Sequence, residues 1–224
     1  MKYQGVFFDF DYTLGDSTPA IAEGYRLGFA ALGLDPPTME QVRHTVGLTL
    51  EDGYSFITGD RDPERQETFF HTFQHSVGVK ADGPGRTLMI EGTTLFSGAA
   101  ELLQALKGAG MHTAIVSTKP GDTIRSIFEH QGYLDLLDLV VGGDEVRHSK
   151  PHPEGLRMAL ERLGLGAEQV LFCGDTVIDA ATAQAGGCQF CAVLNGTTGA
   201  PAFERFPYVH IAEDLDDLKN WLKV

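Results

Sequence analysis

Two aspartates, Asp9 and Asp11, follow the short apolar run at residues 6–8 near the start of the chain. A run this short and this apolar predicts a buried strand rather than a helix. Carboxylates at or just past the carboxyl end of such a strand lie where open α/β sheets bind their ligands. One ionised carboxylate could attack an electrophile or hold a metal while the other carries a proton. Taken alone, the pair is equally well explained as a polar strand end that opens into a loop.

Further polar residues follow other apolar runs along the chain. Ser117 comes directly after one such run, and Asp175 comes shortly after another. Lys150 opens a proline-containing loop, and Asp179 follows Asp175 four residues later. Each has an ordinary explanation by itself, such as a strand-end turn or an acid in the first turn of a helix. Together they predict one site at the carboxyl edge of a parallel sheet.

In their order along the chain, these residues resemble the four-motif signature of the haloacid dehalogenase-like hydrolase superfamily, most closely its phosphoglycolate phosphatase-like branch. The resemblance covers almost the whole chain, and four motifs in order are far more specific than any one of them. It implies that Asp9 attacks phosphorus to give an aspartyl-phosphate, and that Asp11 protonates the leaving alcohol and then activates water. Ser117 and Lys150 would hold the phosphoryl oxygens, and Thr13 would support the first loop.

The same resemblance implies a Mg²⁺ cofactor. It assigns the ion to Asp9, to the backbone carbonyl of Asp11 and to Asp175, with Asp179 assisting through water or from outside the ligand set. The chemistry agrees, because a carboxylate is a poor nucleophile toward an anionic phosphate until the repulsion is neutralised. Mg²⁺ does this as a hard ion that takes oxygen ligands.

Three residues are expected to bind the substrate. Lys119 lies in a Ser-Thr-Lys-Pro segment that resembles the Asn-Lys-Pro motif common in phosphoglycolate phosphatases, with Thr118 in place of the asparagine. Thr49 ends a turn that resembles the specificity loop of the family, although a helix-breaking glycine also explains that turn.

Tyr12 departs from the family, because it replaces the glycine of the first motif. Its ring could fold outward or narrow the entrance to the site.

The characteristic residues that this chain has or lacks distinguish between the activities known within the superfamily. Haloacid dehalogenases lack the second carboxylate that Asp11 provides, and phosphonatases need a cap lysine, whereas no lysine occurs between Lys2 and Lys80. Sugar phosphomutases carry a histidine where this chain has Ile21. We therefore expect a phosphatase that acts on a small phosphorylated metabolite. A nucleotidase, a pyrophosphatase, a sugar-phosphate phosphatase, or a non-catalytic binding protein on the same fold are the alternatives.

From about residue 97 onward, helical and strand-like patterns alternate. Such alternation predicts a parallel sheet wrapped by helices. We therefore expect an α/β fold with a Rossmann-like parallel sheet flanked by helices, formed by residues 1–15 and 96–224.

The segment between these two parts shows helical spacing and no strand pattern up to about residue 78. We expect residues 16–95 to form an inserted small α-helical cap domain with its connector, residues 80–94. A short extended piece is expected at residues 87–90. The resemblance implies that the cap closes over the active site.

Composition limits the class of protein and its partners. The 224 residues are 42% hydrophobic and 21% charged, which suits one full core and a small accessory unit. The formal net charge of -14 argues against binding to nucleic acid or to an anionic membrane. No run approaches the ~20 apolar residues of a membrane span, and no signal peptide is evident, so we expect a cytoplasmic monomer or homodimer. The acidic residues at 213–217 are expected to favour the start of a helix rather than hold a metal.

Three cysteines cannot all pair, and their number is low for a disulfide scaffold, so we expect reduced thiols. Cys188 and Cys191 have the spacing of half a zinc site. The nearby His-x-x-x-His pair, His148 and His152, lies beside prolines that favour a loop. We therefore expect no structural zinc here, but two thiols at the start of a strand.

Overall fold

The protein is described by a computed structural model that covers residues 2–77 and 84–224. The chain divides into two compact units. We call them the core unit, Met1–Gly15 with Leu95–Val224, and the helical unit, Asp16–Thr94. Two short strands, β2 (Gly15–Asp16) and β3 (Thr94–Leu95), pair with each other where the chain passes from one unit to the other.

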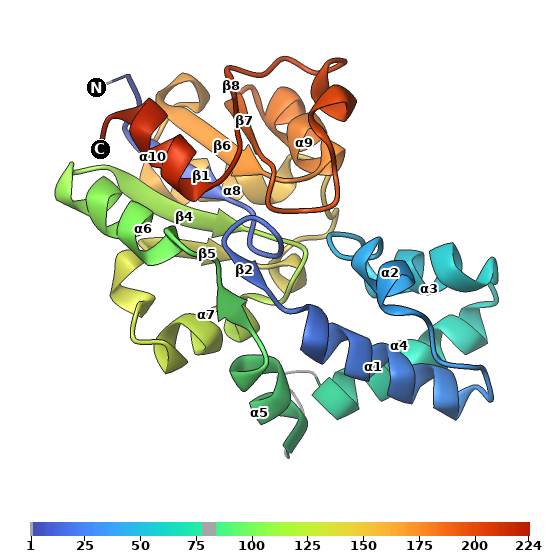
Figure 1. The fold of residues 1–224 in the computed structure, drawn as a ribbon. Helices are drawn as coiled ribbons and strands as arrows, with labels where there is room; N and C mark the ends of the chain where they lie inside the picture. Colours follow the sequence, from blue (N-terminus) through green and yellow to red (C-terminus); the bar gives the residue numbers. More distant parts are fainter. Residues whose placement is uncertain (1, 78–83) are drawn as a thin grey trace. The chain divides into compact units, whose positions relative to one another are not determined.

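A six-stranded parallel sheet forms the middle of the core unit, in the order β5-β4-β1-β6-β7-β8 (Figure 1). Its strands are β1 (Gly5–Phe8), β4 (His112–Val116), β5 (Leu139–Val141), β6 (Val170–Gly174), β7 (Gln189–Val193) and β8 (His210–Ala212). Strand β1 lies between β4 and β6, and Phe8 is level with Ile115 on one side and with Cys173 on the other. The carboxyl ends of these three strands therefore meet at one edge of the sheet.

Helices cover both faces of this sheet. They are α6 (Ala99–Gly108), α7 (Gly121–His130), α8 (Glu154–Leu163), α9 (Val177–Gly186) and α10 (Leu215–Leu222), with short 3-10 turns η1 (Leu134–Leu136), η2 (Gly143–Glu145), η3 (Ala167–Gln169) and η4 (Ala200–Phe203). Side chains alternate between the faces of a strand. Phe7, Phe172 and Phe190 share one buried cluster with Leu156 of α8 and Ala183 of α9. Helices α6 and α10 lie on the other face (Figure 1).

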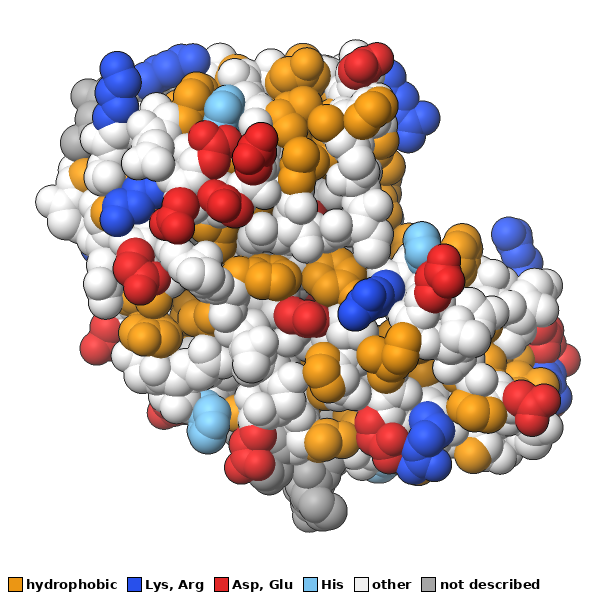
Figure 2. Space-filling model, in the orientation of Figure 1, with side chains coloured by type: hydrophobic (Ala, Val, Ile, Leu, Met, Phe, Trp, Pro, Cys, Tyr) orange, Lys and Arg blue, Asp and Glu red, His pale blue; other side chains and the backbone are white. Residues whose placement is uncertain are grey.

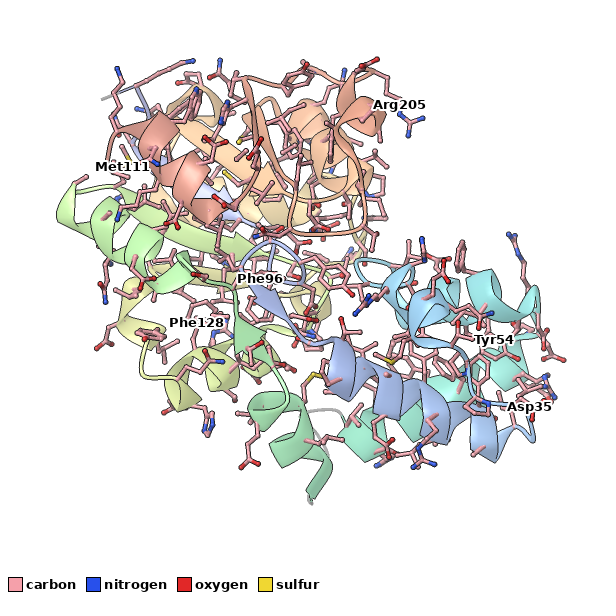
Figure 3. All side chains as sticks on the ribbon, in the orientation of Figure 1. Asp35, Tyr54, Phe96, Met111, Phe128 and Arg205 are labelled. Atoms are coloured by element: carbon pink, nitrogen blue, oxygen red, sulfur yellow. The ribbon has the colours of Figure 1, made fainter. Side chains whose placement is uncertain are left out.

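The helical unit contains α1 (Thr18–Ala31), α2 (Met39–Arg43), α3 (Leu50–Thr58), α4 (Pro63–Val77) and α5 (Pro84–Glu91). Aromatic side chains fill its interior, and the ring centroids of Tyr25 and Phe69 are 5.0 Å apart. Figure 3 shows Tyr54 among these helices, where its side chain is fully buried. A Cβ atom on Gly28 would lie 2.5 Å from the Phe69 ring, so α1 and α4 pack closely because this position lacks a side chain. The unit therefore has an apolar core of its own.

The expected extended piece at residues 87–90 is wrong, because these residues lie within α5. Proline suits the first position of a helix, so Pro84 begins this helix rather than marking a loop. Met89 then packs into the apolar cluster of the helical unit, which the short apolar run alone could not reveal. Residues 80–83 of the expected connector lie outside the described residues.

The expected fold class is confirmed: the core unit is an α/β layer structure around a parallel sheet, and the helical unit follows its first strand. The alternation of helices and strands that we expect from about residue 97 onward is observed as well. Strand β5 begins only at Leu139, because the preceding residues Leu134–Leu136 form a 3-10 turn.

Figure 2 shows acidic side chains gathered on the core unit over β8 and the start of α10. Asp214 caps α10 by accepting a hydrogen bond from the Asp217 backbone N–H at 2.8 Å. Asp217 in turn lies 3.2 Å from His210 Nε2 and accepts a hydrogen bond from the backbone of Glu213. These acids therefore serve the helix terminus, as expected. No helix in the described ranges is long and apolar enough to cross a membrane.

Candidate active site

The site is built where three parallel strands end. Asp9 follows β1, Ser117 follows β4, and Asp175 follows β6, so the common direction of the strands brings the three side chains to one edge of the sheet. The backbone N–H of Asp9 donates to the carbonyl of Cys173 at 2.9 Å, which continues the sheet register up to the site. Lys150 reaches the same edge from the loop that precedes α8.

Lys150 joins two of the expected carboxylates. Its Nζ lies 2.9 Å from Asp9 Oδ2 and 2.6 Å from Asp179 Oδ1, and all three side chains are buried. Burial opposes the charge on Lys150, but the neighbouring carboxylates of Asp179 and Asp9 outweigh it and raise the pKa of this ammonium above its usual range. Lys150 therefore stays charged across the physiological pH range.

A second ion pair lies beside the first. Lys119 Nζ is 3.0 Å from Asp11 Oδ2, and both groups are buried. The backbone N–H of Lys119 donates to Ser117 Oγ at 3.3 Å, so the loop after β4 turns back on itself here. The expected substrate-binding lysine thus contacts the expected acid–base carboxylate directly. Ser117, Thr118 and Lys150 also line one small pocket of the core unit.

Asp175 and Asp179 approach from the β6–α9 connection. Thr13 Oγ1 donates to Asp175 Oδ1 at 3.2 Å, while Asp179 Oδ2 accepts a hydrogen bond from the Thr176 backbone at 3.0 Å as part of a capping box. Burial raises the pKa of Asp175 well above its usual value, and the nearby charges of Asp179 and Asp9 add to that rise. Uncompensated carboxylates at this spacing therefore repel one another.

These residues fit a hard divalent cation. One oxygen from each of Asp9, Asp175 and Asp179 lies within 4.8 Å of the other two. Asp9 Oδ1 and Asp11 Oδ1 are buried and have no hydrogen-bond partner among the described residues. With four carboxylates and two lysines at the site, two negative charges remain uncompensated when all are ionised. An all-oxygen ligand set of this charge favours Mg²⁺.

Tyr12 adopts a left-handed backbone conformation, with φ +59°, and its side chain is buried. This region of φ favours glycine, the residue that the family resemblance places at this position. Its backbone N–H donates to the carbonyl of Gly15 at 2.7 Å and so closes the loop that carries Asp11. Of the two expected orientations of Tyr12, the outward one is wrong, because the ring is not exposed.

Thr49 is the one expected site residue that lies in the helical unit. It caps α3, where its hydroxyl oxygen accepts a hydrogen bond from the Asp52 backbone at 3.1 Å and donates to Asp52 Oδ2 at 3.0 Å. The contacts of Thr49 within its own unit are therefore those of a helix cap.

Some residues of the site went unrecognised in the sequence. Asn195 Nδ2 donates to the carbonyl of Thr13 at 3.2 Å and steadies the loop after β1. A Cβ atom on Gly196 would lie 2.0 Å from Asp175 Oδ2, so a glycine here leaves room for that carboxylate. Neither position stands out by residue type. The Thr176–Asp179 capping box, in contrast, has a recognisable spacing and could have been found.

Comparison with known proteins agrees with this architecture. Residues 6–193 match the model of the haloacid dehalogenase-like hydrolase family. The phosphoglycolate phosphatase of Escherichia coli (strain K12) is 28% identical over 228 residues, which cover 96% of this chain and 90% of that protein. The phosphoglycolate phosphatase of Salmonella typhi is 30% identical over 198 residues, or 83% of this chain and 79% of that protein.

A solved structure of a haloacid dehalogenase-like hydrolase from Bacteroides fragilis superposes with a TM-score of 0.89 at 35% identity, covering 97% of this chain and all of that one. The chain therefore belongs to the haloacid dehalogenase-like hydrolase family. The expectation of an enzyme of this family, a phosphoric monoester hydrolase, is confirmed at that level.

Proposed function

We propose that the chain is a Mg²⁺-dependent phosphatase that hydrolyses a small phosphate monoester, such as 2-phosphoglycolate, through an aspartyl-phosphate on Asp9. The observation that carries the proposal is the state of the Asp9 carboxylate. One of its oxygens is bound by Lys150, and the other is buried and has no hydrogen-bond partner within the described part of the chain. A buried oxygen that lacks a hydrogen bond costs stability, so its retention suits an atom that meets a ligand or reacts.

In the first step, an Asp9 oxygen attacks the phosphorus atom, and the bond between phosphorus and the ester oxygen breaks. Asp11 donates a proton to the departing ester oxygen, which leaves as a neutral alcohol. In the second step, Asp11 accepts a proton from a water molecule that attacks the phosphorus of the aspartyl-phosphate. Inorganic phosphate leaves, and the Asp9 carboxylate is restored.

Positive charge and hydrogen-bond donors must surround the phosphoryl oxygens in both steps. The neighbouring carboxylates raise the pKa of Lys150, which lies against Asp9, so a charged ammonium is placed to hold a phosphoryl oxygen. Ser117 offers its hydroxyl from the adjacent strand end, where it lines the same pocket as Lys150. Asp9, Asp175, Asp179 and the Asp11 backbone would hold Mg²⁺, which when bound neutralises the repulsion between the carboxylates and the phosphate.

Lys119 supports a substrate whose alcohol part is anionic. Its ammonium lies 3.0 Å from Asp11, the residue that is to protonate the leaving oxygen, so the positive charge stands beside the leaving group. A carboxylate close to the ester oxygen, as in 2-phosphoglycolate, would meet this charge. The names of the curated relatives, which are phosphoglycolate phosphatases, point to the same class.

The remaining assignments are part of the same proposal. Thr118 lines the pocket of the core unit and is placed to contact the substrate. Thr49 would contact the substrate from the helical unit, which would serve as the cap domain. The three buried cysteines are free thiols, which suits a reducing compartment such as the cytoplasm.

A screen over phosphorylated metabolites tests the proposal, with the Asp9→Asn protein assayed in parallel to exclude contaminating phosphatases. We expect the highest kcat/KM for small organic phosphates, full loss of turnover in excess chelator and recovery with Mg²⁺. Calcium should inhibit, because its higher and more flexible coordination misplaces the nucleophile. A far higher kcat/KM for nucleotides or pyrophosphate would overturn the substrate class. Turnover in excess chelator would overturn the metal requirement, and inactivity toward every phosphate would favour a binding protein.

A further inference from the structure

Two histidines flank the catalytic lysine on its loop. His148 precedes Lys150 by two residues and His152 follows it by two, and Glu154 is the first residue of α8. The prolines keep this segment out of a helix, so the usual one-turn spacing of a paired histidine ligand does not apply here. The loop nevertheless brings the two imidazole rings together, with centroids 4.7 Å apart.

Glu154 approaches both rings with one carboxylate oxygen. Its Oε2 is 2.7 Å from His148 Nδ1 and 3.9 Å from His152 Nδ1. The carboxylate is itself held in place, because the backbone N–H groups of Arg147 and His148 donate to it at 2.8 Å and 3.2 Å. One ligand atom from each of His148, His152 and Glu154 lies within 4.8 Å of the other two.

We propose that His148, His152 and Glu154 form a second metal site, which binds a divalent transition-metal ion such as Zn²⁺. Two imidazoles and one carboxylate are ligands that Zn²⁺ uses with an open position for water, whereas Mg²⁺ prefers oxygen ligands alone. The site is thus chemically distinct from the all-carboxylate cluster of Asp9, Asp175 and Asp179.

The geometry needs little adjustment to hold an ion. Bonds from Zn²⁺ to nitrogen and oxygen are about 2.0–2.2 Å long. The ligand atoms around a bound Zn²⁺ therefore lie closer to one another than the 4.8 Å within which these three atoms now lie. Both imidazoles are at least half exposed and can rotate, with side-chain exposures of 64% for His148 and 50% for His152. Glu154 supplies the fixed point toward which they turn.

A hydrogen bond from His148 to Glu154 would close the loop without any metal, and this is the alternative to exclude. It accounts for His148 but not for His152, whose Nδ1 lies beyond hydrogen-bond distance from Glu154 at 3.9 Å. A bound ion would use both rings and would link the two sides of the loop that carries Lys150. Its binding should therefore slow amide hydrogen exchange in residues 147–153.

The test is a Zn²⁺ titration of the full chain in a large excess of Mg²⁺, so that the carboxylate cluster is occupied by its preferred ion. Competition with a chromogenic chelator should show one equivalent of bound Zn²⁺. Replacing a ligand by His152→Ala should weaken that binding by about 10–100-fold or more. Zn²⁺ should also raise Tm and protect the loop amides in the unmodified chain, but not in the variant.

The matched control removes two other histidines that are one helical turn apart. His71 and His75 lie on α4 with ring centroids 6.4 Å apart, and the His71→Ala/His75→Ala protein should bind Zn²⁺ like the unmodified chain. Asp175→Asn, which removes a ligand of the carboxylate cluster, should also leave the Zn²⁺ affinity unchanged. Equal Zn²⁺ affinity with and without His152, or loss of binding in the Asp175→Asn protein alone, would overturn the proposed site.

Discussion

The ammonium of Lys119 lies 3.0 Å from Asp11 Oδ2, and both side chains are buried. A charged pair that is out of water is costly to break by removing one partner, because the other charge is left uncompensated. Asp11 is therefore held in one orientation by the same lysine that, in the proposed reaction, lies beside the leaving group.

Replacing Lys119 by methionine should lower kcat/KM for 2-phosphoglycolate more than for an ester whose alcohol part is uncharged, such as ethyl phosphate. A hydrogen bond to a charged group contributes about 1.5–3 kcal/mol, so we expect the ratio of the two kcat/KM values to fall by roughly 10–100-fold. Lys107→Met is the matched control, because Lys107 pairs with Asp138 at a more exposed place, and it should leave the ratio unchanged. An unchanged ratio with phosphatase activity retained would remove Lys119 from substrate selection while leaving the reaction class intact.

The two leading carboxylates should respond differently to amidation. Asp9→Asn should abolish turnover, because an amide is a poor nucleophile and a weaker metal ligand, so no phosphoenzyme forms. Asp11→Asn keeps the nucleophile but removes the proton carrier, whose usual contribution is ~10²–10⁴-fold, and turnover should fall by that factor. With p-nitrophenyl phosphate, whose leaving group needs less protonation, a phosphoenzyme should accumulate and be detected by intact-protein mass spectrometry.

Each carboxylate assignment has its own contrary result. Near-normal turnover by Asp9→Asn protein, after mass spectrometry has excluded deamidation, would remove Asp9 as the nucleophile. An unaffected Asp11→Asn enzyme would remove Asp11 as the acid and base.

The Thr49→Ala variant tests whether Thr49 only caps helix α3 or also contacts the substrate. Loss of the side-chain cap of α3 should lower the free energy of unfolding by about 0.5–2 kcal/mol. Thr38, which caps α2 in the same way, provides the control, since Thr38→Ala should cost a similar amount. Only Thr49→Ala should change the order of preferred substrates in the metabolite screen. If both variants keep the order of the unmodified chain, Thr49 is a helix cap and nothing more.

The sheet was predictable because its strands are short, mostly apolar runs separated by helical patterns, and a parallel sheet leaves few other ways to bury them. The same logic brings Asp9, Ser117 and Asp175 to one edge, since each follows such a run. Helix α5 was not predictable in this way. Its apolar residues are few, and only packing in the helical unit distinguishes them from an extended segment.

Contacts between loops that are distant in the sequence could not be predicted from it. Nothing in the spacing of Lys119 and Asp11 indicates that they form an ion pair, because they lie 108 positions apart in the sequence. The approach of His148 and His152 depends on a proline-containing loop, whose path no periodic pattern specifies. Residue type suggested chemistry at these positions, but the distances that decide it depend on the three-dimensional arrangement of the loops.

The stability of the core unit should depend on pH through Asp138. Burial acts to raise the pKa of this carboxyl, but hydrogen bonds from Lys107 and the Thr113 backbone outweigh it and hold the pKa below its usual value. A lowered native pKa contributes stability above the unfolded value of ~3.9 and loses that contribution as pH falls through the native value. Urea unfolding should therefore show Asp138→Asn to be less stable than the unmodified chain at pH 7. The difference should shrink below about pH 4, and a constant difference at all pH values would contradict this.

Gly196 provides a test of the metal site that does not alter any ligand. A methyl group there would lie 2.0 Å from Asp175 Oδ2, closer than nonbonded atoms can approach, and the buried carboxylate has little room to move away. Gly196→Ala should therefore displace Asp175 and raise the Mg²⁺ concentration needed for half-maximal activity by about 10–100-fold, as when the support of a metal ligand is lost. Gly199→Ala is the matched control, because its methyl group would meet nothing closer than 3.7 Å. Equal Mg²⁺ requirements in the two variants, with both proteins folded by circular dichroism, would show that Asp175 does not hold the metal in the way proposed.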